Sequence, residues 1–443
     1  MWRCEVAGLS LLIDPVCSPT HHDGLFSVHP RRRFDLDGLD DGVIVVSHRH
    51  PDHFDPDTLA GLAARRPDRL LLTADPLVAE VGLRLGLRHA RVLPPMQAVD
   101  LGGAALLPTP SRAPVREWGM MVASEGGLTW NQVDAALGGP EEVRRVLGEA
   151  AGLGLRGPVD LLLARWCPIH HTAGLDGGGS AFPYAAYAAE IERIAAVGAR
   201  TVVPAAASTR YAGEHWLNRF AYPVDEARAL LDLRARLPGA QVERAAVGRR
   251  FVVDRGVAVE DVAGPVAAED GADPRAWRPL DAEPLTDDRP VTGARVERVR
   301  AWIEGSLRPS LDRWAWERPV GLRLEVLHGE ERAVYAWRVD ADGVREGDPE
   351  AWDALVVVGG GALDEVITGR SPWGRAMLSG QLRAVQRGYR VSEKGMRRMQ
   401  IPAVFLYVAL PYEAAFQRWL AGRLAALPGG ARVIPARTRL AHD

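Results

Sequence analysis

The chain has 443 residues, of which 47% are apolar and 25% are charged, the proportions of an ordinary globular protein. This length exceeds what one hydrophobic core normally supports, so we expect two or three domains. The formal net charge of -3 offers no overall basic character for binding nucleic acid, and no apolar run approaches the roughly 18 residues of a membrane span.

The three cysteines, Cys4, Cys17 and Cys167, are too few and too scattered for a disulfide framework or a cysteine-rich metal site. We therefore expect a reducing, cytoplasmic compartment. The apolar run near the N-terminus is short and lacks the small-residue cleavage pattern of a signal peptide, which favours a strand.

Short apolar runs bounded by Gly, Pro or Asp predict strands in the first half of the chain. They lie at 6–13, 43–47, 69–73, 91–94, 104–107, 120–124, 127–130, 159–164 and 200–204. Apolar residues at helical spacing and helix formers predict helices at 55–65, 76–86, 140–152 and 183–198. Strands followed by alternating helices and strands indicate an α/β sandwich whose helices cover the faces of its sheets.

An irregular, acidic and proline-rich segment predicts a linker at 256–291, between a domain at 1–255 and a second domain at 292–443. The second domain is expected to be a smaller α+β unit. Its expected elements are strands at 321–327, 332–339 and 354–358, a helix starting near Leu363, and a further element at 377–385.

The strongest chemical signal is the segment SHRHPDHFD, which directly follows the apolar run at 43–47. It places His48, His50, Asp52 and His53 within six positions. Zinc, iron and manganese accept imidazole and carboxylate ligands, and a loop at the end of a strand can direct them to one point. The pattern predicts a binuclear metal centre. The alternative is a polar loop whose histidines only cap the next helix.

This H-x-H-x-D-H pattern resembles the metal-binding motif of the metallo-β-lactamase superfamily, and the likeness covers roughly residues 5–225. LLIDP, with Asp14, is similar to a strand end of that family, and Asp134 in TWNQVDAA stands where the family has its metal-bridging aspartate. The resemblance implies an αββα sandwich. It also implies that His48 and His50 hold one metal, that Asp52 and His53 hold the other, and that Asp134 bridges them, with Asp52 and Asp134 as the catalytic residues.

The sequence departs from most hydrolytic members of the superfamily, which supply a further histidine before the bridging aspartate. The only histidine between His53 and Asp134 is His89, which comes too early. Glu117 is the best substitute ligand, although a solvated loop carboxylate is the alternative. A carboxylate in place of an imidazole makes the centre harder and more anionic, which favours iron or manganese over zinc.

A last histidine is also expected after the strand at 200–204, where the chain reads AAASTRYAG. The candidates for this ligand are His215 and the pair His170-His171, chiefly His171. For each of them a structural or surface role remains an equal alternative.

Within the superfamily, the stretch 159–225 resembles the CMP-N-acetylneuraminate hydroxylase group. The similar features are Val133-Asp134, the segment GGSAFP at 178–183, Pro204 and Glu214-His215. That group carries an additional Rieske domain, which needs a C-x-H pair as well as a C-x-x-H pair, and this sequence has no C-x-H pair. The likeness therefore implies the catalytic fold alone.

The C-terminal part weakly resembles sterol-carrier-like domains through LDEVITGRSPWGRAMLSGQLRAV, from Leu363 to Val385. Alkyl sulfatases pair such a module with a metallo-β-lactamase domain, which gives a hydrolase precedent. The alternative is a small lid or dimerisation domain, and in the second case the chain would form a homodimer.

Taken together, these features favour a di-iron, O2-dependent oxygenase that acts on a small polar metabolite with electrons from an external donor. The alternative is a zinc or manganese hydrolase of an ester, lactone, phosphodiester or sulfate ester, in which a metal-bound water attacks the substrate. A third hypothesis is a scaffold protein that has lost catalysis. The five retained ligand residues argue against this third hypothesis.

Overall fold

The computed structural model divides into two compact units, Met1–Leu280 with Arg390–Arg397 and Asp281–Tyr389 with Arg398–Asp443. None of the helices in the described part of the chain combines the length and hydropathy needed to cross a bilayer. The structure describes residues 1–22, 24–34, 37–39, 42–169, 182–205, 208–212, 218, 221–262, 266–268, 287, 289–313, 316–317, 319–378, 381–402 and 404–425.

A five-stranded sheet in the first unit has the order β1-β2-β6-β7-β8. Its last four strands are parallel, and β1 pairs antiparallel with β2. Where one strand was expected at 6–13, the chain instead forms two, because Ala7 and Gly8 adopt left-handed backbone angles that turn it back. The strands are β1 (Trp2–Val6), β2 (Leu9–Ile13), β6 (Val43–Val46), β7 (Leu70–Thr73) and β8 (His89–Val92).

A seven-stranded sheet has the order β16-β14-β13-β12-β11-β10-β9. Strands β12, β13, β14 and β16 run parallel, whereas β9 to β12 are joined as antiparallel neighbours. The strands are β9 (Val99–Asp100), β10 (Ala104–Thr109), β11 (Gly119–Ser124), β12 (Gly127–Asn131), β13 (Leu161–Arg165), β14 (Thr201–Ala205) and β16 (Gln241–Val242).

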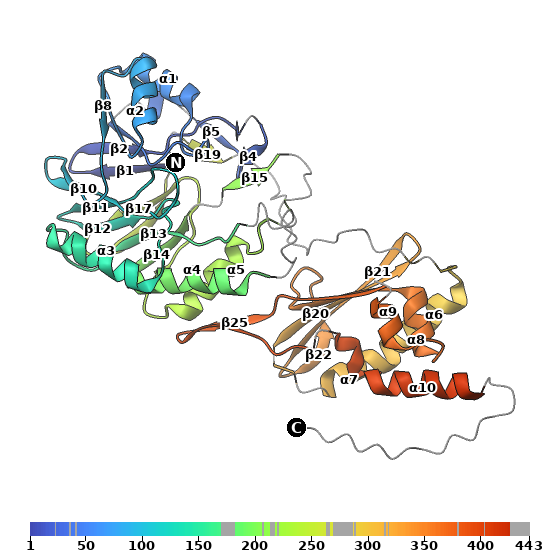
Figure 1. Ribbon diagram of the computed structural model, residues 1–443. Helices are drawn as coiled ribbons and strands as arrows, with labels where there is room; N and C mark the ends of the chain where they lie inside the picture. The colour runs from blue at the N-terminus through green and yellow to red at the C-terminus, as the bar shows by residue number, and fades with distance from the viewer. Residues whose placement is uncertain are drawn as a thin grey trace. The chain divides into compact units, whose positions relative to one another are not determined.

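Helices cover the outer face of each sheet (Figure 1). Helices α1 (Pro56–Arg65) and α2 (Pro76–Arg84) bury Leu59, Leu62 and Val78 against the first sheet. Along the outer side of the second sheet lie α3 (Pro140–Gly152), α4 (Tyr184–Val197) and α5 (Glu226–Arg236). Both expected helices over the first sheet are confirmed, as are α3 and α4 over the second.

The two sheets share an apolar core, to which Leu11, Val45 and Leu72 contribute from the first sheet and Leu106 and Met120 from the second. Alternate residues of β2 and β6 instead face the helices, because successive side chains of a strand point to opposite faces. The unit is therefore a four-layer αββα sandwich, as expected from the sequence.

The first unit also contains several small sheets. A three-stranded sheet joins β3 (Thr20–His21), β4 (Phe26–Val28) and β15 (Thr209–Tyr211). The segment expected as a linker contributes β18 (Val257–Asp261) and β19 (Val266–Ala268), so its first part is regular rather than irregular. The apolar side chains of Phe251, Val253 and Val257 explain this, since they pack against the second sheet. Partner strands are β17 (Arg249–Val253) and β5 (Arg32–Phe34), and a short helix spans Asp37–Leu39.

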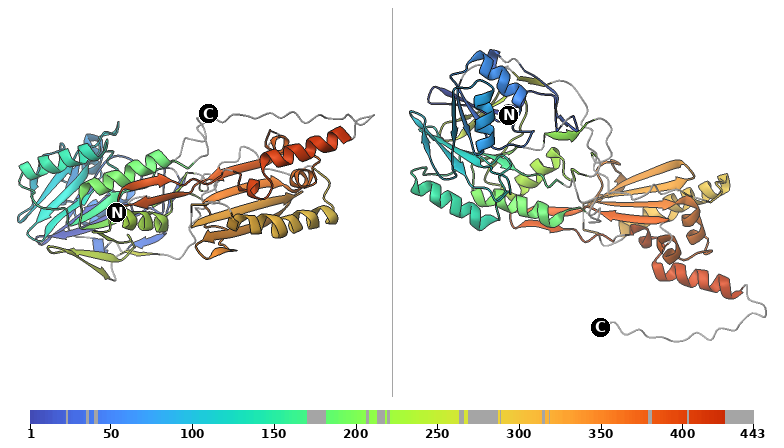
Figure 2. Two further views of the ribbon diagram at one scale, coloured as in Figure 1. Left: turned by 90° about the horizontal axis from the view of Figure 1, so that it is seen from below. Right: turned by 45° about the horizontal axis from the view of Figure 1, so that its top comes forward.

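The second unit is a smaller α+β domain that combines helices with a sheet (Figure 2). The order of the strands in this sheet is β22-β21-β20-β23-β24. Leu322, Leu324 and Val356 lie on one face of this sheet and share an apolar core with residues of the helices, such as Leu307 and Leu363. The sheet strands are β20 (Val320–His328), β21 (Glu331–Asp340), β22 (Gly343–Glu346), β23 (Ala354–Gly359) and β24 (Leu382–Gln386). The other elements of this unit are α6 (Gly293–Trp302), a π-helical turn at Ile303–Leu307, α7 (Arg308–Arg313), α8 (Gly360–Ile367), α9 (Trp373–Leu378), a 3-10 helix at Phe405–Val408 and α10 (Tyr412–Ala425). The pair β25 (Tyr389–Ser392) and β26 (Gly395–Arg398) lies almost wholly in the segment that belongs to the first unit.

Candidate metal centre

The centre is built on the C-terminal ends of β2 and β6, which are parallel neighbours and therefore end at the same edge of the first sheet. Asp14 follows β2 and is buried. Its carboxylate accepts hydrogen bonds from the backbone N–H of Ser47 at 2.7 Å and from the Ser47 hydroxyl at 3.0 Å. The same carboxylate lies 2.9 Å from Nδ1 of His53. Asp14 thus ties the histidine-rich loop to the sheet.

Nδ1 of His48 lies 2.9 Å from the Ser47 hydroxyl, so the histidine is oriented by the group that contacts Asp14. Outer contacts of this kind fix the ring and tautomer of metal-ligating histidines. Arg49 extends away from the histidines and pairs with the buried carboxylate of Asp75, with Nη2 to Oδ1 at 2.8 Å. Because Asp75 also caps α2, this pair holds the loop against the helix.

His48, His53 and Asp134 form a group whose ligand atoms all lie within 4.8 Å of one another. Asp134 follows β12 of the second sheet, and its Oδ2 lies 3.2 Å from Nε2 of His53. Residues 81 positions apart are therefore brought together by the packing of the two sheets. One borderline cation could be held by these three side chains.

The other residues of the motif surround this group. Nδ1 of the exposed His50 lies 2.9 Å from Nε2 of His48. Oδ2 of Asp52 is 3.6 Å from Nε2 of His53, and its side chain is half-buried. All four motif residues thus lie at one edge of the sandwich.

Glu117, which precedes β11, is buried, and its Oε2 is 4.0 Å from Nε2 of His48. The Ser111 hydroxyl donates to its other oxygen, Oε1, and in turn accepts the backbone N–H of Ala136 at 2.9 Å. One carboxylate oxygen is thereby anchored while the other faces the histidine. Glu117 is not a solvated loop residue.

The surroundings of the histidines and aspartates at this edge change their pKa values. Burial, together with the neighbouring His53, lowers the pKa of His48 to about 4, so its ring is neutral at pH 7. Burial alone would raise the pKa of Asp134 and of Asp14, but the adjacent imidazoles lower both below their usual values. Burial would also lower the pKa of His53, but the carboxylates of Asp134 and Asp14 raise it well above its ordinary value. The raised pKa favours the protonated form of His53 beside these two carboxylates.

Arg165, at the end of β13, donates from Nη1 to the backbone carbonyl of Asp134 at 3.1 Å. Its backbone N–H donates to Oε1 of Gln132 at 3.2 Å. These bonds fix the turn that carries Asp134. They also place a permanent positive charge beside the anionic ligand set.

Two expected ligands, His171 and His215, lie outside the described residues, as does His170. His89 is exposed on β8.

A second ligand group, missed by the sequence analysis, consists of His21, His22 and Asp52. Its ligand atoms also lie within 4.8 Å of one another. The sequence could have indicated this group, because the adjacent histidines begin only seven residues after Asp14 in the segment that follows β2.

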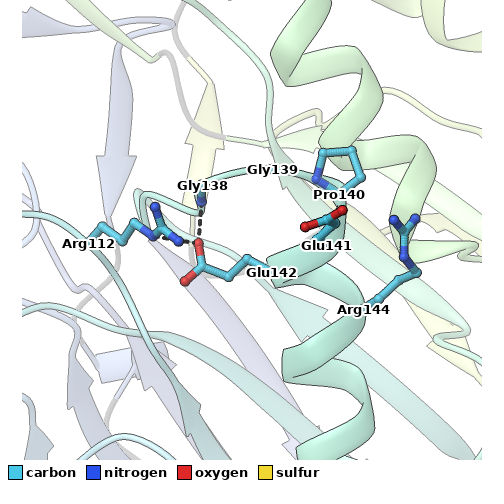
Figure 3. Close-up of a pocket in the computed structure, with 7 residues that line it drawn as sticks. All are labelled: Arg112, Gly138, Gly139, Pro140, Glu141, Glu142 and Arg144. Atoms are coloured by element: carbon cyan, nitrogen blue, oxygen red, sulfur yellow. Dashed lines mark hydrogen bonds and ion pairs between the residues drawn. The ribbon is translucent and has the colours of Figure 1, made fainter.

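A separate pocket of about 490 Å³ lies at the start of α3 (Figure 3). In it Arg112 pairs with Glu142 at 2.8 Å, and Glu142 also accepts the backbone N–H of Gly138. Its lining residues are Arg112, Gly138, Gly139, Pro140, Glu141, Glu142 and Arg144. None of them belongs to either of the two groups of described residues that could hold a metal ion.

No model of a protein family and no curated protein sequence matches the chain. Among solved structures, CmlA, a diiron beta-hydroxylase from Streptomyces venezuelae, is 19% identical with a TM-score of 0.36, over 54% of this chain and 49% of CmlA. The metallo-beta-lactamase fold protein YhfI from Bacillus subtilis is 13% identical with a TM-score of 0.31, over 46% of this chain and 73% of YhfI.

The sterol carrier protein 2 like 2 of Aedes aegypti is 20% identical with a TM-score of 0.15, over 21% of this chain and 83% of that protein. The sterol-carrier similarity of the C-terminal part is thus weak. The chain spans about half the length of CmlA.

Proposed function

We propose that the chain is a binuclear metalloenzyme. One ion is held by His48, His50 and Glu117, the other by Asp52 and His53, and Asp134 bridges the two ions. Support comes from the convergence of these side chains at one edge of the sandwich and from a neutral His48 beside an ionised Asp134. Such a donor set fits borderline and harder divalent cations.

The observation that carries the choice of chemistry is the buried Glu117 carboxylate, 4.0 Å from His48. A carboxylate at this place favours iron or manganese over zinc. We therefore propose a di-iron, O2-dependent oxygenase that acts on a small polar metabolite. When bound, two iron ions would supply the redox chemistry that reduces O2 with electrons from an external donor.

The protein's own residues would hold this centre in one arrangement. Asp14 orients His53 through Nδ1 and leaves Nε2 directed toward Asp134. Ser47 orients His48 in the same way, and Ser111 orients Glu117. Arg165 offsets part of the negative charge of Asp134 and Glu117. The half-buried Asp52 and exposed His50 leave the side of the centre where substrate would approach open to solvent.

The test is metal analysis of protein produced with iron, combined with O2 consumption under a chemical reductant. We expect iron to exceed zinc, a visible ferric-oxo absorption band, and O2 uptake. Glu117→His is the informative variant, because it restores an imidazole and should shift the bound metal toward zinc; Glu117→Gln controls for loss of charge alone.

The alternative function is a metal-dependent hydrolase of an ester, lactone, phosphodiester or sulfate ester. The partly exposed Asp52 beside His53 favours it, since this carboxylate could orient an attacking water. Turnover of such substrates by the zinc or manganese protein in strictly anaerobic buffer, with no O2 uptake by the iron protein, would replace the oxygenase proposal with this one.

A further inference from the structure

We propose that His21 and His22 bind a metal ion together with Asp52, and so supply two imidazole ligands to the ion that Asp52 holds. The ligand atoms of these three side chains lie within 4.8 Å of one another. The inference rests on the proposed function only in placing Asp52 at a metal centre. It assigns a site to a segment that the H-x-H-x-D-H pattern does not include.

The chain between β2 and β3 is fastened to the start of α1, which places the two histidines next to the motif. The backbone N–H of Cys17 donates to Oγ1 of Thr58 at 3.0 Å. The backbone N–H of Ser18 donates to Oδ2 of Asp55, the N-cap of α1, at 3.1 Å. Because Asp55 comes three residues after Asp52, these bonds join the histidine-bearing segment to the metal-binding loop.

The sheet formed by β3, β4 and β15 holds the imidazole rings. His21 is buried opposite Phe26 in the β3–β4 pair, and their rings stack with centroids 5.4 Å apart. The His22 ring meets the edge of Phe26 at 5.3 Å, and its backbone has a left-handed φ of 51°. A non-glycine residue adopts this conformation at a cost that surrounding contacts must offset, and such residues cluster at functional sites.

The nitrogen atoms are arranged as ligands would be. Nδ1 of His21 and Nδ1 of His22 face each other at 2.7 Å. Two neutral imidazoles in this arrangement can share only one hydrogen, whereas two nitrogens on one cation, each at about 2.1 Å, lie about 3 Å apart. A small widening of the pair would therefore accommodate an ion. Nε2 of His21 lies 3.4 Å from the hydroxyl of Thr209, a contact of the kind that orients a ligating ring.

Two histidines and one carboxylate, with other positions left open, form a ligand set that suits non-haem Fe(II). Oδ2 of Asp52 also lies 3.6 Å from Nε2 of His53, so Asp52 connects this group to the group around Asp134. His21 is buried and His22 is exposed, which leaves one side of the site accessible to solvent. Imidazoles from the N-terminal segment would thus take the role for which the sequence analysis sought a histidine late in the chain.

The test counts metal per chain after anaerobic loading with Fe(II), and with Co(II) as a spectroscopic probe, followed by removal of excess ions. His21→Gln/His22→Gln should bind one ion fewer than the wild-type protein and keep the ion held by His48. The exposed His22→Ala variant, which leaves the buried ring in place, should weaken one Co(II) site at least about 10-fold. Anomalous scattering should locate an ion within bonding distance of both Nδ1 atoms.

His89→Ala, which removes an exposed histidine of β8, is the matched control and should leave the metal count unchanged. The inference would be overturned if the double variant and His22→Ala both kept the wild-type metal count and Co(II) affinity while circular dichroism showed that they were folded. That result would leave the binuclear proposal standing. A wild-type protein that binds no transition metal would overturn both.

Discussion

Each of the two units contains a cluster around one aspartate, and the two clusters differ in chemistry. In the second unit the fully buried Asp364 accepts hydrogen bonds from Arg298, at 2.9 and 3.2 Å, and from Arg370, and Arg295 lies 3.7 Å away. In the first unit Asp134 is paired instead with the imidazole of His53.

The difference lies in the partner. A guanidinium stays protonated and has no lone pair, so Asp364 is satisfied permanently by groups that cannot bind a cation. An imidazole can exchange its proton for a metal ion, and the carboxylate beside it is then free to bind the same ion. Partner type would therefore separate a carboxylate that stabilises the fold from one that could bind a metal ion.

The most direct test of this difference is to replace the aspartate of each cluster by asparagine. Asp134→Asn should remove at least one bound ion and lower turnover at least about 1,000-fold, because the lost metal supplies several kcal/mol of transition-state stabilisation. Metal analysis and steady-state kinetics measure both effects. Retention of the full metal content would contradict the bridging role of Asp134.

Asp364→Asn should act on stability instead. Removing the charge leaves three arginines around a buried site, and we expect the free energy of unfolding of the second unit to fall by about 3 kcal/mol. Denaturant unfolding followed by fluorescence measures this loss. The metal content should not change, and loss of metal in this variant would show that the two clusters are not independent.

Ser47→Ala tests whether the contacts behind the ligands matter. It removes the hydroxyl that links Asp14 to Nδ1 of His48, and contacts of this kind contribute 10- to 100-fold to metal affinity. We expect Co(II) affinity to fall by about that factor. Ser124→Ala, at the exposed end of β11, is the control and should bind Co(II) as the wild type does.

Metal binding should release a proton near pH 7. The carboxylates of Asp134 and Asp14 raise the pKa of His53 well above its ordinary value in the metal-free protein, whereas a ligating imidazole must be deprotonated. Apparent affinity should therefore rise with pH, by up to about tenfold per unit, until the pH passes the pKa of His53. Calorimetry in buffers of different ionisation enthalpy measures the proton; no released proton would contradict a protonated His53.

Much of the first unit was predictable because its signals are local. The apolar run at 43–47 and the histidine motif after it are contiguous, and α3 occupies the predicted residues 140–152. The small strands β3, β4 and β15 were not predicted, because two or three residues are too few to establish a period. The hairpin at Ala7 and Gly8 was also missed, since a continuous apolar run hides a turn.

The sequence by itself indicated an α/β sandwich and the candidate ligand types of the motif, since periodicity and adjacent ligands are encoded within short stretches. The αββα arrangement was implied by the resemblance of the motif to a known superfamily. Only the tertiary structure decided which distant residues join them. The packing of two sheets sets Glu117 beside His48, and the anchoring of residues 17 and 18 to α1 sets His21 and His22 beside Asp52. No local pattern specifies such contacts, because they depend on where separate strands end in space.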